Sequence, residues 1–251
     1  MLLAIDVGNS DTKFGFSNGH EWLGVWRRPT HPPGDASQIA QWLGDNLSKA
    51  GIPLQVERVA CVSVVPENEQ LITDLSSLVN GKEPVFLHAG LIPSLKIFYE
   101  PQDSVGADRL ANVLGALKQY PAPLIVVDFG TATTLDVCSE EGFLGGAILP
   151  GVKLQIASLA QRTSKLSEVE ATAPQSAIGQ STTAAVQSGV VLGHVAAVEG
   201  LIAKIQKELP LPATVLGTGG LAHLFMGQTP AIHHFVPQLT LEGALSLLGE
   251  G

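Results

Sequence analysis

The chain has 251 residues, of which 45% are hydrophobic and 15% are charged. This supply of apolar residues is enough for one large or two small cores, so an intrinsically disordered chain is excluded. The formal charge is −9, and the densest basic cluster is the pair Arg27-Arg28. A general nucleic-acid-binding protein is therefore disfavoured, because its affinity depends on clustered positive charge.

The start of the chain and its cysteines predict where the protein resides. Residues 1–5 are apolar and strand-like, without the basic start of a signal peptide. No uninterrupted run reaches the roughly 20 apolar residues that a membrane-spanning helix needs. Cys61 and Cys138 each lie inside an apolar run, which is typical of buried, reduced thiols. We expect a cytoplasmic protein that binds neither membranes nor nucleic acids.

In chain order, the apolar pattern predicts alternating strands and helices. In the first half, strands are expected over 2–6, 12–17, 21–28, 59–64 and 84–88, and helices over 36–50, 67–79 and 106–119. In the second half, strands are expected over 124–128, 133–139, 142–149 and 213–217, and helices over 182–208, 221–225 and 239–248. The chain is thus expected to be an α/β protein.

One pattern occurs twice. Residues 3–10 (LAIDVGNS) and 125–132 (IVVDFGTA) both read as an apolar strand, Asp, an apolar residue, Gly and a small polar end. Each segment continues into a predicted hairpin. The distance between the copies is far above the period of repeat arrays, so the pattern indicates a duplicated fold. We predict two similar domains, 1–120 and 121–251, that face one another across a central cleft.

The two Asp-x-Gly turns are candidate phosphate-binding elements. Glycine allows a close approach of the backbone, whose N–H groups can bind an anion. The carboxylate of Asp6 or Asp128 could hold Mg²⁺ or another hard cation against the phosphates. A single copy is more simply an ordinary hairpin turn, because Asp and Gly are common there. Two copies, each after a very apolar strand, favour a function.

A third candidate lies at the start of the predicted helix 106–119. Asp108 alone is most simply a first-turn acid that complements the helix dipole. The adjacent Arg109 could bind a carboxylate or phosphate with two hydrogen bonds. Beside such a residue, Asp108 could instead accept the proton of a substrate hydroxyl during phosphoryl transfer.

Several other functional classes find little support. Residues 217–222 (GTGGLA) match the dinucleotide-binding pattern only loosely, and fit better as a glycine-rich turn that meets a nucleotide in another way. The sequence contains no P-loop and no Gly-x-Ser-x-Gly elbow. His233 and His234 are adjacent, but no third residue has the spacing of a zinc ligand.

Taken in order, these segments resemble the type III pantothenate kinases. The resemblance covers nearly the whole chain, and its motifs are residues 6–10 (DVGNS), 99–101 with 105–109 (YEP and VGADR), 128–134 (DFGTATT), 145–151, 179–182 (GQST) and 218–220 (TGG). Ser10 stands where Thr is more usual, and Ser181 where Asn or Asp is more usual.

The resemblance implies a fold and a reaction. The fold would consist of duplicated ribonuclease H-like domains of the actin/Hsp70 type. The reaction would be phosphorylation of pantothenate by ATP to 4′-phosphopantothenate, the first step of coenzyme A biosynthesis. Members of the family work as homodimers, use Mg²⁺ with ATP, and need a monovalent cation, K⁺ or NH₄⁺.

The resemblance also implies roles for individual residues. Asp108 would be the catalytic base, and Asp128 would coordinate the monovalent cation. The first Asp-x-Gly turn, by its own chemistry, makes Asp6 the candidate to hold Mg²⁺. The residues expected to bind pantothenate are Tyr99, Gly106, Ala107, Asp108, Arg109 and Thr182. Those expected to bind ATP are Asp6, Val7, Gly8, Asn9, Ser10, Asp11, Thr12, Lys13 and Thr131.

Two alternatives remain open at this stage. The first is another kinase or phosphatase of the same fold that acts on a sugar, an acid or polyphosphate. The phosphate turns would be the same, so the segment 99–109 and a screen of phosphoryl acceptors would discriminate. The second is a non-catalytic regulator that keeps the fold and binds nucleotide, against which the presence of Asp6, Asp108, Arg109 and Asp128 argues.

Overall fold

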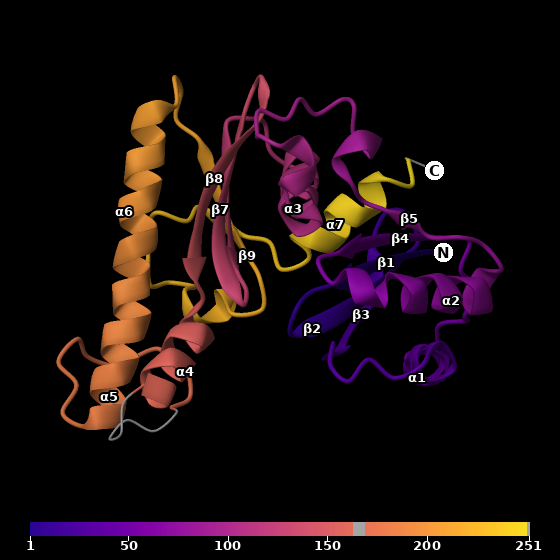
Figure 1. Ribbon diagram of the computed structural model, residues 1–251, viewed down its shortest axis with the longest axis horizontal. Helices are drawn as coiled ribbons and strands as arrows, with labels where there is room; N and C mark the ends of the chain where they lie inside the picture. The colour runs from indigo at the N-terminus through magenta and orange to yellow at the C-terminus, as the bar shows by residue number, and fades with distance from the viewer. Residues whose placement is uncertain (163–168, 250–251) are drawn as a thin grey trace. The chain divides into compact units, whose positions relative to one another are not determined.

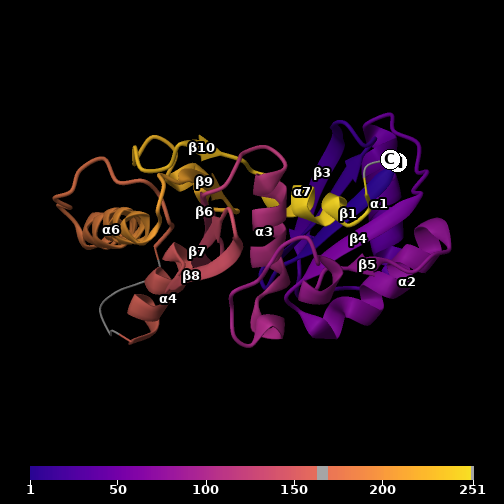
Figure 2. The same ribbon diagram turned by 90° about the horizontal axis from the view of Figure 1, so that it is seen from above.

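The computed structural model describes residues 1–162 and 169–249 (Figures 1 and 2). It divides into two compact units, each built on a five-stranded sheet. The first unit combines residues 1–119 with the C-terminal segment from Leu239, and the second unit is Tyr120–Gln238.

The sheet of the first unit has the order β3-β2-β1-β4-β5. Its strands are β1 (Leu2–Val7), β2 (Asp11–Ser17), β3 (Trp22–Pro29), β4 (Arg58–Ser63) and β5 (Val85–Phe86). The central strand β1 pairs antiparallel with β2 and parallel with β4. Backbone hydrogen bonds therefore hold β1 on both sides, which suits its almost wholly apolar sequence.

Two helices and an apolar core cover one face of this sheet. The helices are α1 (Ala36–Lys49) and α2 (Glu69–Asn80). Helix α1 starts with a capping box, in which Asp35 and Gln38 each bind the other's backbone N–H. The core between sheet and helices includes the buried residues Leu3, Ile5, Phe14, Ile39, Leu43, Leu47, Ile72 and Leu75. The spacing of these residues on α1 is the one that the sequence predicts.

The second unit repeats the strand topology of the first. Its strands are β6 (Leu124–Phe129), β7 (Ala132–Ser139), β8 (Gly142–Pro150), β9 (Thr214–Thr218) and β10 (His234–Phe235), in the order β10-β9-β6-β7-β8. Strand β6 takes the place of β1, with β7 antiparallel on one side and β9 parallel on the other. The duplicated α/β fold predicted from the sequence is therefore confirmed.

A long helical segment covers one face of the second sheet (Figure 2). It consists of α5 (Thr182–Gln187), a π-helical turn (Ser188–Leu192) and α6 (Gly193–Glu208). By length and mean hydropathy this segment could cross a membrane, although no uninterrupted apolar run suggested one. Its buried residues, among them Val191, Val198 and Ile202, pack in the core of the second unit, which accounts for its apolar composition.

The last helix, α7 (Leu239–Ser246), packs with the first unit, whereas the predicted domain 121–251 included it. It lies against α3 (Ala107–Leu117) and strands β1 and β4. Two glycines allow the close crossing: a Cβ on Gly115 would lie 2.3 Å from the oxygen of Leu239, and a Cβ on Gly243 would lie 1.9 Å from that of Ala111. Contacts between segments far apart in sequence thus decide where α7 belongs.

Polar contacts add to this packing. The Thr240 hydroxyl donates to Asn112 Oδ1 at 2.8 Å in a buried position on α3. The indole N–H of Trp22, on β3, donates to Glu242 Oε1 at 2.6 Å. Both bonds join α7 to other parts of the first unit.

Two elements escape the sequence prediction. Helix α4 (Val152–Arg162) follows β8 directly, and β10 is too short for an alternating pattern to show. The predicted helix 221–225 is a single 3₁₀ turn. The 3₁₀ turns are Pro66–Asn68, Ala89–Leu91, Gln102–Ser104 and Ala222–Leu224.

The packing of α7 on α3 predicts a large effect of Gly243→Ala. The added methyl group would collide with the backbone of Ala111 and push the helices apart, at a cost of about 1–3 kcal/mol or more. Chemical denaturation followed by tryptophan fluorescence measures this unit specifically, because Trp22, Trp26 and Trp42 all belong to it.

Gly44→Ala is the matched control. A Cβ on Gly44, inside α1, meets no heavy atom within 4 Å. This variant should be unchanged or more stable by roughly 0.5–1 kcal/mol, since alanine favours a helix. Equal stability of the two variants would contradict the proposed close packing of α7.

Candidate functional site

The first Asp-x-Gly turn follows the central strand β1. Asp6 is buried, and the β1–β2 register places it opposite Lys13. The Lys13 ammonium group donates to Asp6 Oδ2 at 3.0 Å. The turn closes through a hydrogen bond from Gly8 N to Asp11 O at 3.1 Å. A carboxylate and an ammonium group are thus held together at the end of a rigid strand.

Thr30, at the end of β3, supports this turn from behind. Its backbone N–H donates to Ser10 O at 2.9 Å, and its hydroxyl donates to Gly8 O at 2.7 Å. A second hydroxyl, that of Thr12, lies 3.0 Å from the Thr30 hydroxyl. Asn9 and Ser10 remain exposed at the tip. No sequence pattern marks Thr30, because its role depends on how β3 returns to the turn.

The second turn has the same position in its sheet. Asp128 lies on β6 opposite Thr134, as Asp6 lies opposite Lys13. Gly130 N donates to Ala132 O at 3.0 Å, and Gly151 N, after β8, donates to Thr131 O at 3.0 Å. The side chain of Thr131 is exposed, as a residue that meets a ligand requires.

A third glycine-containing turn, at Gly219, packs against the second turn. Thr218, at the end of β9, pairs with Asp128 in the parallel register, so their side chains share one face of the sheet. Gly219 has φ = 99°, and a Cβ there would lie 2.4 Å from Asp128 Oδ1. Only glycine fits this approach, which brings Leu221 N to a hydrogen bond of 3.0 Å with Phe129 O.

The chemistry beside Asp128 suits a hard cation. Carboxylate and hydroxyl oxygens are the ligands that such ions prefer. In the part of the chain that the structure describes, the Thr218 hydroxyl oxygen is buried without a hydrogen-bond partner. A buried polar atom without a hydrogen-bond partner destabilises the fold unless a ligand satisfies it. Asp128 and Thr218 thus have the oxygen groups that would fit a hard cation.

The predicted substrate segment comes together at the N-terminus of α3. Asp108 Oδ1 accepts a hydrogen bond of 2.8 Å from the backbone N–H of Arg109. Arg109 is 6% exposed, and its guanidinium carbon lies 5.7 Å from the centre of the Tyr99 ring. Gly106 is the N-cap residue of the helix. The structure thus brings Tyr99, Asp108 and Arg109 together, with the carboxylate hydrogen-bonded and the guanidinium over an aromatic ring.

Thr182 is the first residue of α5 and is exposed. Ser181, which departs from the usual family pattern, is the N-cap: its Oγ accepts from Ala184 N at 3.1 Å. The first unit thus carries residues 6–13, Tyr99 and 106–109, and the second carries Asp128, Thr131 and Thr182.

A buried histidine supports the second turn and escaped the sequence analysis. His194, on α6, is 2% exposed, and its Nε2 lies 3.0 Å from the hydroxyl of Thr133. Its Nδ1 lies 2.9 Å from the side-chain nitrogen of Gln155 on α4. Burial lowers the pKa of His194 below its usual value, so the neutral ring is favoured.

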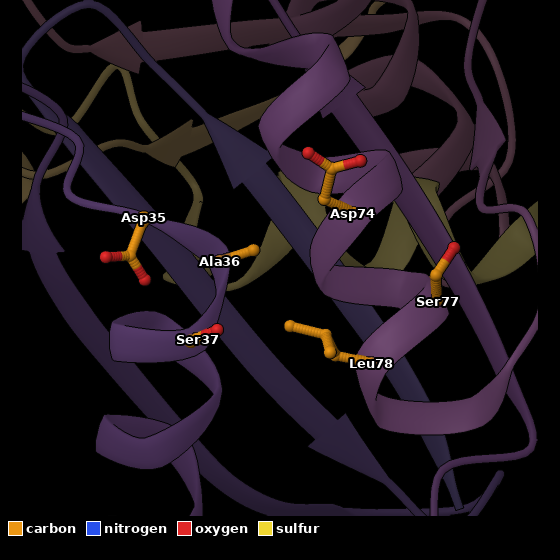
Figure 3. A pocket seen from close by; sticks show the side chains of 6 residues that line it. All are labelled: Asp35, Ala36, Ser37, Asp74, Ser77 and Leu78. Carbon is orange, nitrogen blue, oxygen red and sulfur yellow. The ribbon is translucent and has the colours of Figure 1, made fainter.

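A surface hollow lies elsewhere in the first unit (Figure 3). It has a volume of about 520 Å³ and lies between the start of α1 and the side of α2. Its lining residues are Asp35, Ala36, Ser37, Asp74, Ser77 and Leu78. None of them is a predicted site residue. The lining contains the carboxylates of Asp35 and Asp74 and no Lys or Arg, so its negative charge would repel a triphosphate.

The sequence matches one family over most of its length. The profile of the family described as Type III pantothenate kinase matches residues 2–204. The chain belongs to the type III pantothenate kinase family. This result confirms the resemblance inferred from the motifs.

Similar curated proteins carry the same name. A type III pantothenate kinase of Phenylobacterium zucineum is 41% identical over 249 residues, which cover 98% of this chain and 97% of the relative. A type III pantothenate kinase of Caulobacter vibrioides is 38% identical over 251 residues, which cover 98% of this chain and 96% of the relative. Both similarities extend through the C-terminal segment, which lies beyond the part that the family profile matches.

Similar solved structures support the fold. A Baf family transcriptional activator from Campylobacter jejuni has a TM-score of 0.63 at 18% identity and covers 99% of this chain and 98% of its own. The ROK hexokinase from Thermus thermophilus has a TM-score of 0.52 at 13% identity and covers 98% of this chain and 97% of its own. The predicted fold of the actin/Hsp70 type, which includes such sugar kinases, is confirmed.

The burial of His194 predicts an acid-dependent loss of stability. The pKa of His194 is lower in the folded than in the unfolded protein, so the unfolded state binds more protons as the pH falls below about 6.5. The stability present above that pH should therefore decrease until the pH reaches the folded-state pKa. Denaturant titrations at pH 7.5 and 5.5 measure the loss.

His194→Phe is the comparison variant. Phenylalanine keeps a ring beside Phe129 and Phe225 but cannot take up a proton. The variant should be less stable than the wild type at pH 7.5, because Thr133 and Gln155 lose a partner. Its further loss on acidification should be smaller, and an equal loss in both proteins would contradict the assignment.

Proposed function

We propose that this protein transfers the γ-phosphate of ATP to the 4′-hydroxyl of pantothenate, the first step of coenzyme A biosynthesis. The observation that carries the proposal is the match of nearly the whole chain, at 41% and 38% identity, to two proteins named type III pantothenate kinase. The geometry supports it, because the duplicated turns have phosphate-binding form and the segment 99–109 presents a fixed carboxylate.

ATP would be bound by the phosphate turns. In the first turn these residues are Asp6, Val7, Gly8, Asn9, Ser10, Asp11, Thr12 and Lys13, and in the second turn Thr131. The Lys13 ammonium group, now paired with Asp6, supplies positive charge next to exposed turn residues. When Mg²⁺ is bound with ATP it neutralises phosphate charge, and the carboxylate of Asp6 is the group that would hold it.

Pantothenate would be bound by Tyr99, Gly106, Ala107, Asp108, Arg109 and Thr182. Asp108 is the catalytic base, whose carboxylate accepts the proton of the 4′-hydroxyl as that oxygen forms its bond to the γ-phosphorus. The bond from the γ-phosphorus to the β–γ bridging oxygen breaks, and ADP leaves with the electron pair. The hydrogen bond from Arg109 N keeps the Asp108 carboxylate in place. The Arg109 guanidinium would donate to substrate oxygens.

A monovalent cation, K⁺ or NH₄⁺, would be held by Asp128. The support is the oxygen-rich position beside Thr218, whose hydroxyl is buried and unsatisfied in the described structure. The ion would add fixed positive charge next to the second turn, which favours binding of the phosphates.

A homodimer is the proposed assembly, and the cytoplasm the proposed location. Strand β8 is an edge strand of the second sheet. Two of its residues are solvent-exposed, with exposed fractions of 38% for Leu144 and 61% for Ile148. Leu154 on the following helix, α4, is exposed by 50%. Apolar side chains on an open sheet edge favour association unless they are covered. A second copy of the chain would cover this surface.

A coupled assay of ADP release tests the function. Purified protein is given ATP and Mg²⁺, with or without pantothenate, in K⁺ or in Na⁺. Release that requires pantothenate and is faster in K⁺ supports both the substrate and the cation. No pantothenate-dependent release from folded protein contradicts the proposal, and a panel of sugars, acids and polyphosphate then identifies another acceptor or none.

Asp108→Asn should reduce kcat by at least about 100-fold and leave the affinity for ATP nearly unchanged. The amide keeps the shape of the side chain but cannot accept the substrate proton, and general base catalysis contributes roughly 10²–10⁴-fold. Steady-state kinetics and ATP titration measure the two quantities. Asp45→Asn, an exposed position on α1 outside the proposed site, is the control and should behave like the wild type. Near-normal turnover of Asp108→Asn would remove this residue as the base.

Asp128→Ala should weaken activation by K⁺. Removal of the carboxylate takes away the main charged ligand of the cation, so the K⁺ concentration for half-maximal activity should rise about tenfold or more. Titration of the rate with KCl at constant ionic strength gives this value. Asp74→Ala on α2 removes an exposed carboxylate elsewhere and should leave the titration unchanged. An unaltered K⁺ dependence of Asp128→Ala would contradict the role.

A further inference from the structure

His194 lies beside three segments around the second phosphate turn. Its ring bonds Thr133, the first buried residue of β7 after the turn, and lies 6.3 Å from the ring of Phe129 before the turn. It also lies 5.5 Å from the ring of Phe225, which follows the turn at Gly219. Phe129 and Phe225 are themselves stacked at 4.0 Å. One imidazole thus lies beneath the turn that carries Thr131.

The hydrogen bonds of the ring fix a single tautomer. The side-chain nitrogen of Gln155 donates to Pro150 O at 2.8 Å, so this end of the amide is a donor. It can therefore only donate to His194 Nδ1, which must accept. The proton then resides on Nε2, which donates to the Thr133 hydroxyl. Because both ring nitrogens are engaged, the neutral ring cannot rotate without loss of a buried hydrogen bond.

The equivalent threonine of the first unit has a different hydrogen-bond partner. The strand registers make Thr12 the counterpart of Thr133, since Thr12 pairs with Val7 and Thr133 pairs with Phe129. The hydroxyl of Thr12 is bonded to another hydroxyl, that of Thr30, the residue that follows β3. The hydroxyl of Thr133 is bonded instead to a side chain on the long helix. Thr133 is therefore bonded to a helix, whereas Thr12 is bonded to the residue that follows β3.

The helix that carries His194 begins at a predicted substrate residue. Thr182 starts α5, and the π-helical turn Ser188–Leu192 joins α5 to α6 just before His194. A π-helical turn adds a residue to the helical path and so changes which side chains face the sheet after it, and such turns are frequent at functional sites. This turn contributes to placing His194 under the phosphate turn.

We propose that His194 is a positioning residue for nucleotide binding: through Thr133 and Phe129 it holds the second phosphate turn in its binding conformation, and it couples that turn to the helix that starts at Thr182. The inference rests on the proposed function, because it takes the second turn to be an ATP-binding element. His194 does not touch the substrates, and its effect is expected on nucleotide affinity more than on kcat.

Calorimetric titration with a non-hydrolysable ATP analogue, in Mg²⁺ and K⁺, tests the proposal on the full chain. His194→Phe and Thr133→Val should each weaken binding by about 5- to 10-fold, because each removes the same buried hydrogen bond. The double variant should be little weaker than either single variant, since that bond can be lost only once. His194→Gln, which keeps an N–H donor, should recover part of the affinity.

Thr229→Val is the matched control. Thr229 is a buried threonine of the same unit whose hydroxyl donates to Glu199 at 2.7 Å, away from the turn. The Thr229→Val variant should lower the melting temperature, as Thr133→Val does, but should leave the affinity for the ATP analogue unchanged. In the His194 variants, the KM for pantothenate should rise less than the KM for ATP. A general loosening of the core would not affect the two KM values differently.

The outcomes separate this inference from the proposed function. Wild-type affinity in folded His194→Phe and Thr133→Val, or an equal loss in Thr229→Val, overturns the role of His194. A wild-type protein that binds the analogue but does not phosphorylate pantothenate contradicts the function alone, and the affinities of the variants still decide about His194. A wild-type protein that binds no analogue overturns both.

Discussion

The pairing of each central strand on both sides is the constraint from which the candidate site follows. Strand β1 lies between antiparallel β2 and parallel β4, and β6 lies between β7 and β9 in the same way. The ladders fix the direction in which each strand ends, so the carboxylates of Asp6 and Asp128 are placed by backbone hydrogen bonds. The turns after them can then present exposed residues without losing their shape, which is the preorganisation that binding of a charged ligand needs.

The two turns share this frame but are supported by different means. The first is closed by Thr30, whose hydroxyl and N–H both bond the turn backbone. The second is closed by Gly151 N, by the close approach of Gly219 and by the ring of His194. Duplication thus preserved the strand register, whereas the supporting contacts diverged. Such divergence fits a protein in which the halves have different tasks at the phosphates.

The C-terminal helix links the end of the chain to the proposed catalytic base. Helix α3 carries Asp108 at its N-terminus and packs on α7 along much of its length, with Asn112 bonded to Thr240 in a buried position. The orientation of α3 depends on this packing, because the crossing at Gly115 and Gly243 leaves no free space. Helix α7 therefore helps to position a side chain that lies far earlier in the sequence.

The sequence by itself determined the apolar strands, the duplicated Asp-x-Gly pattern, the long helix and the family motifs, because each of these is a local pattern of residue types. It did not determine helix α4 or strand β10, whose own patterns are weak or too short, nor the unit to which α7 belongs. It also did not reveal Thr30 or His194, which act on Gly8 and Thr133 at separations of 22 and 61 residues. Only the tertiary structure decided these features, since hydrogen bonds and close packing between distant segments exist only once the strands have paired.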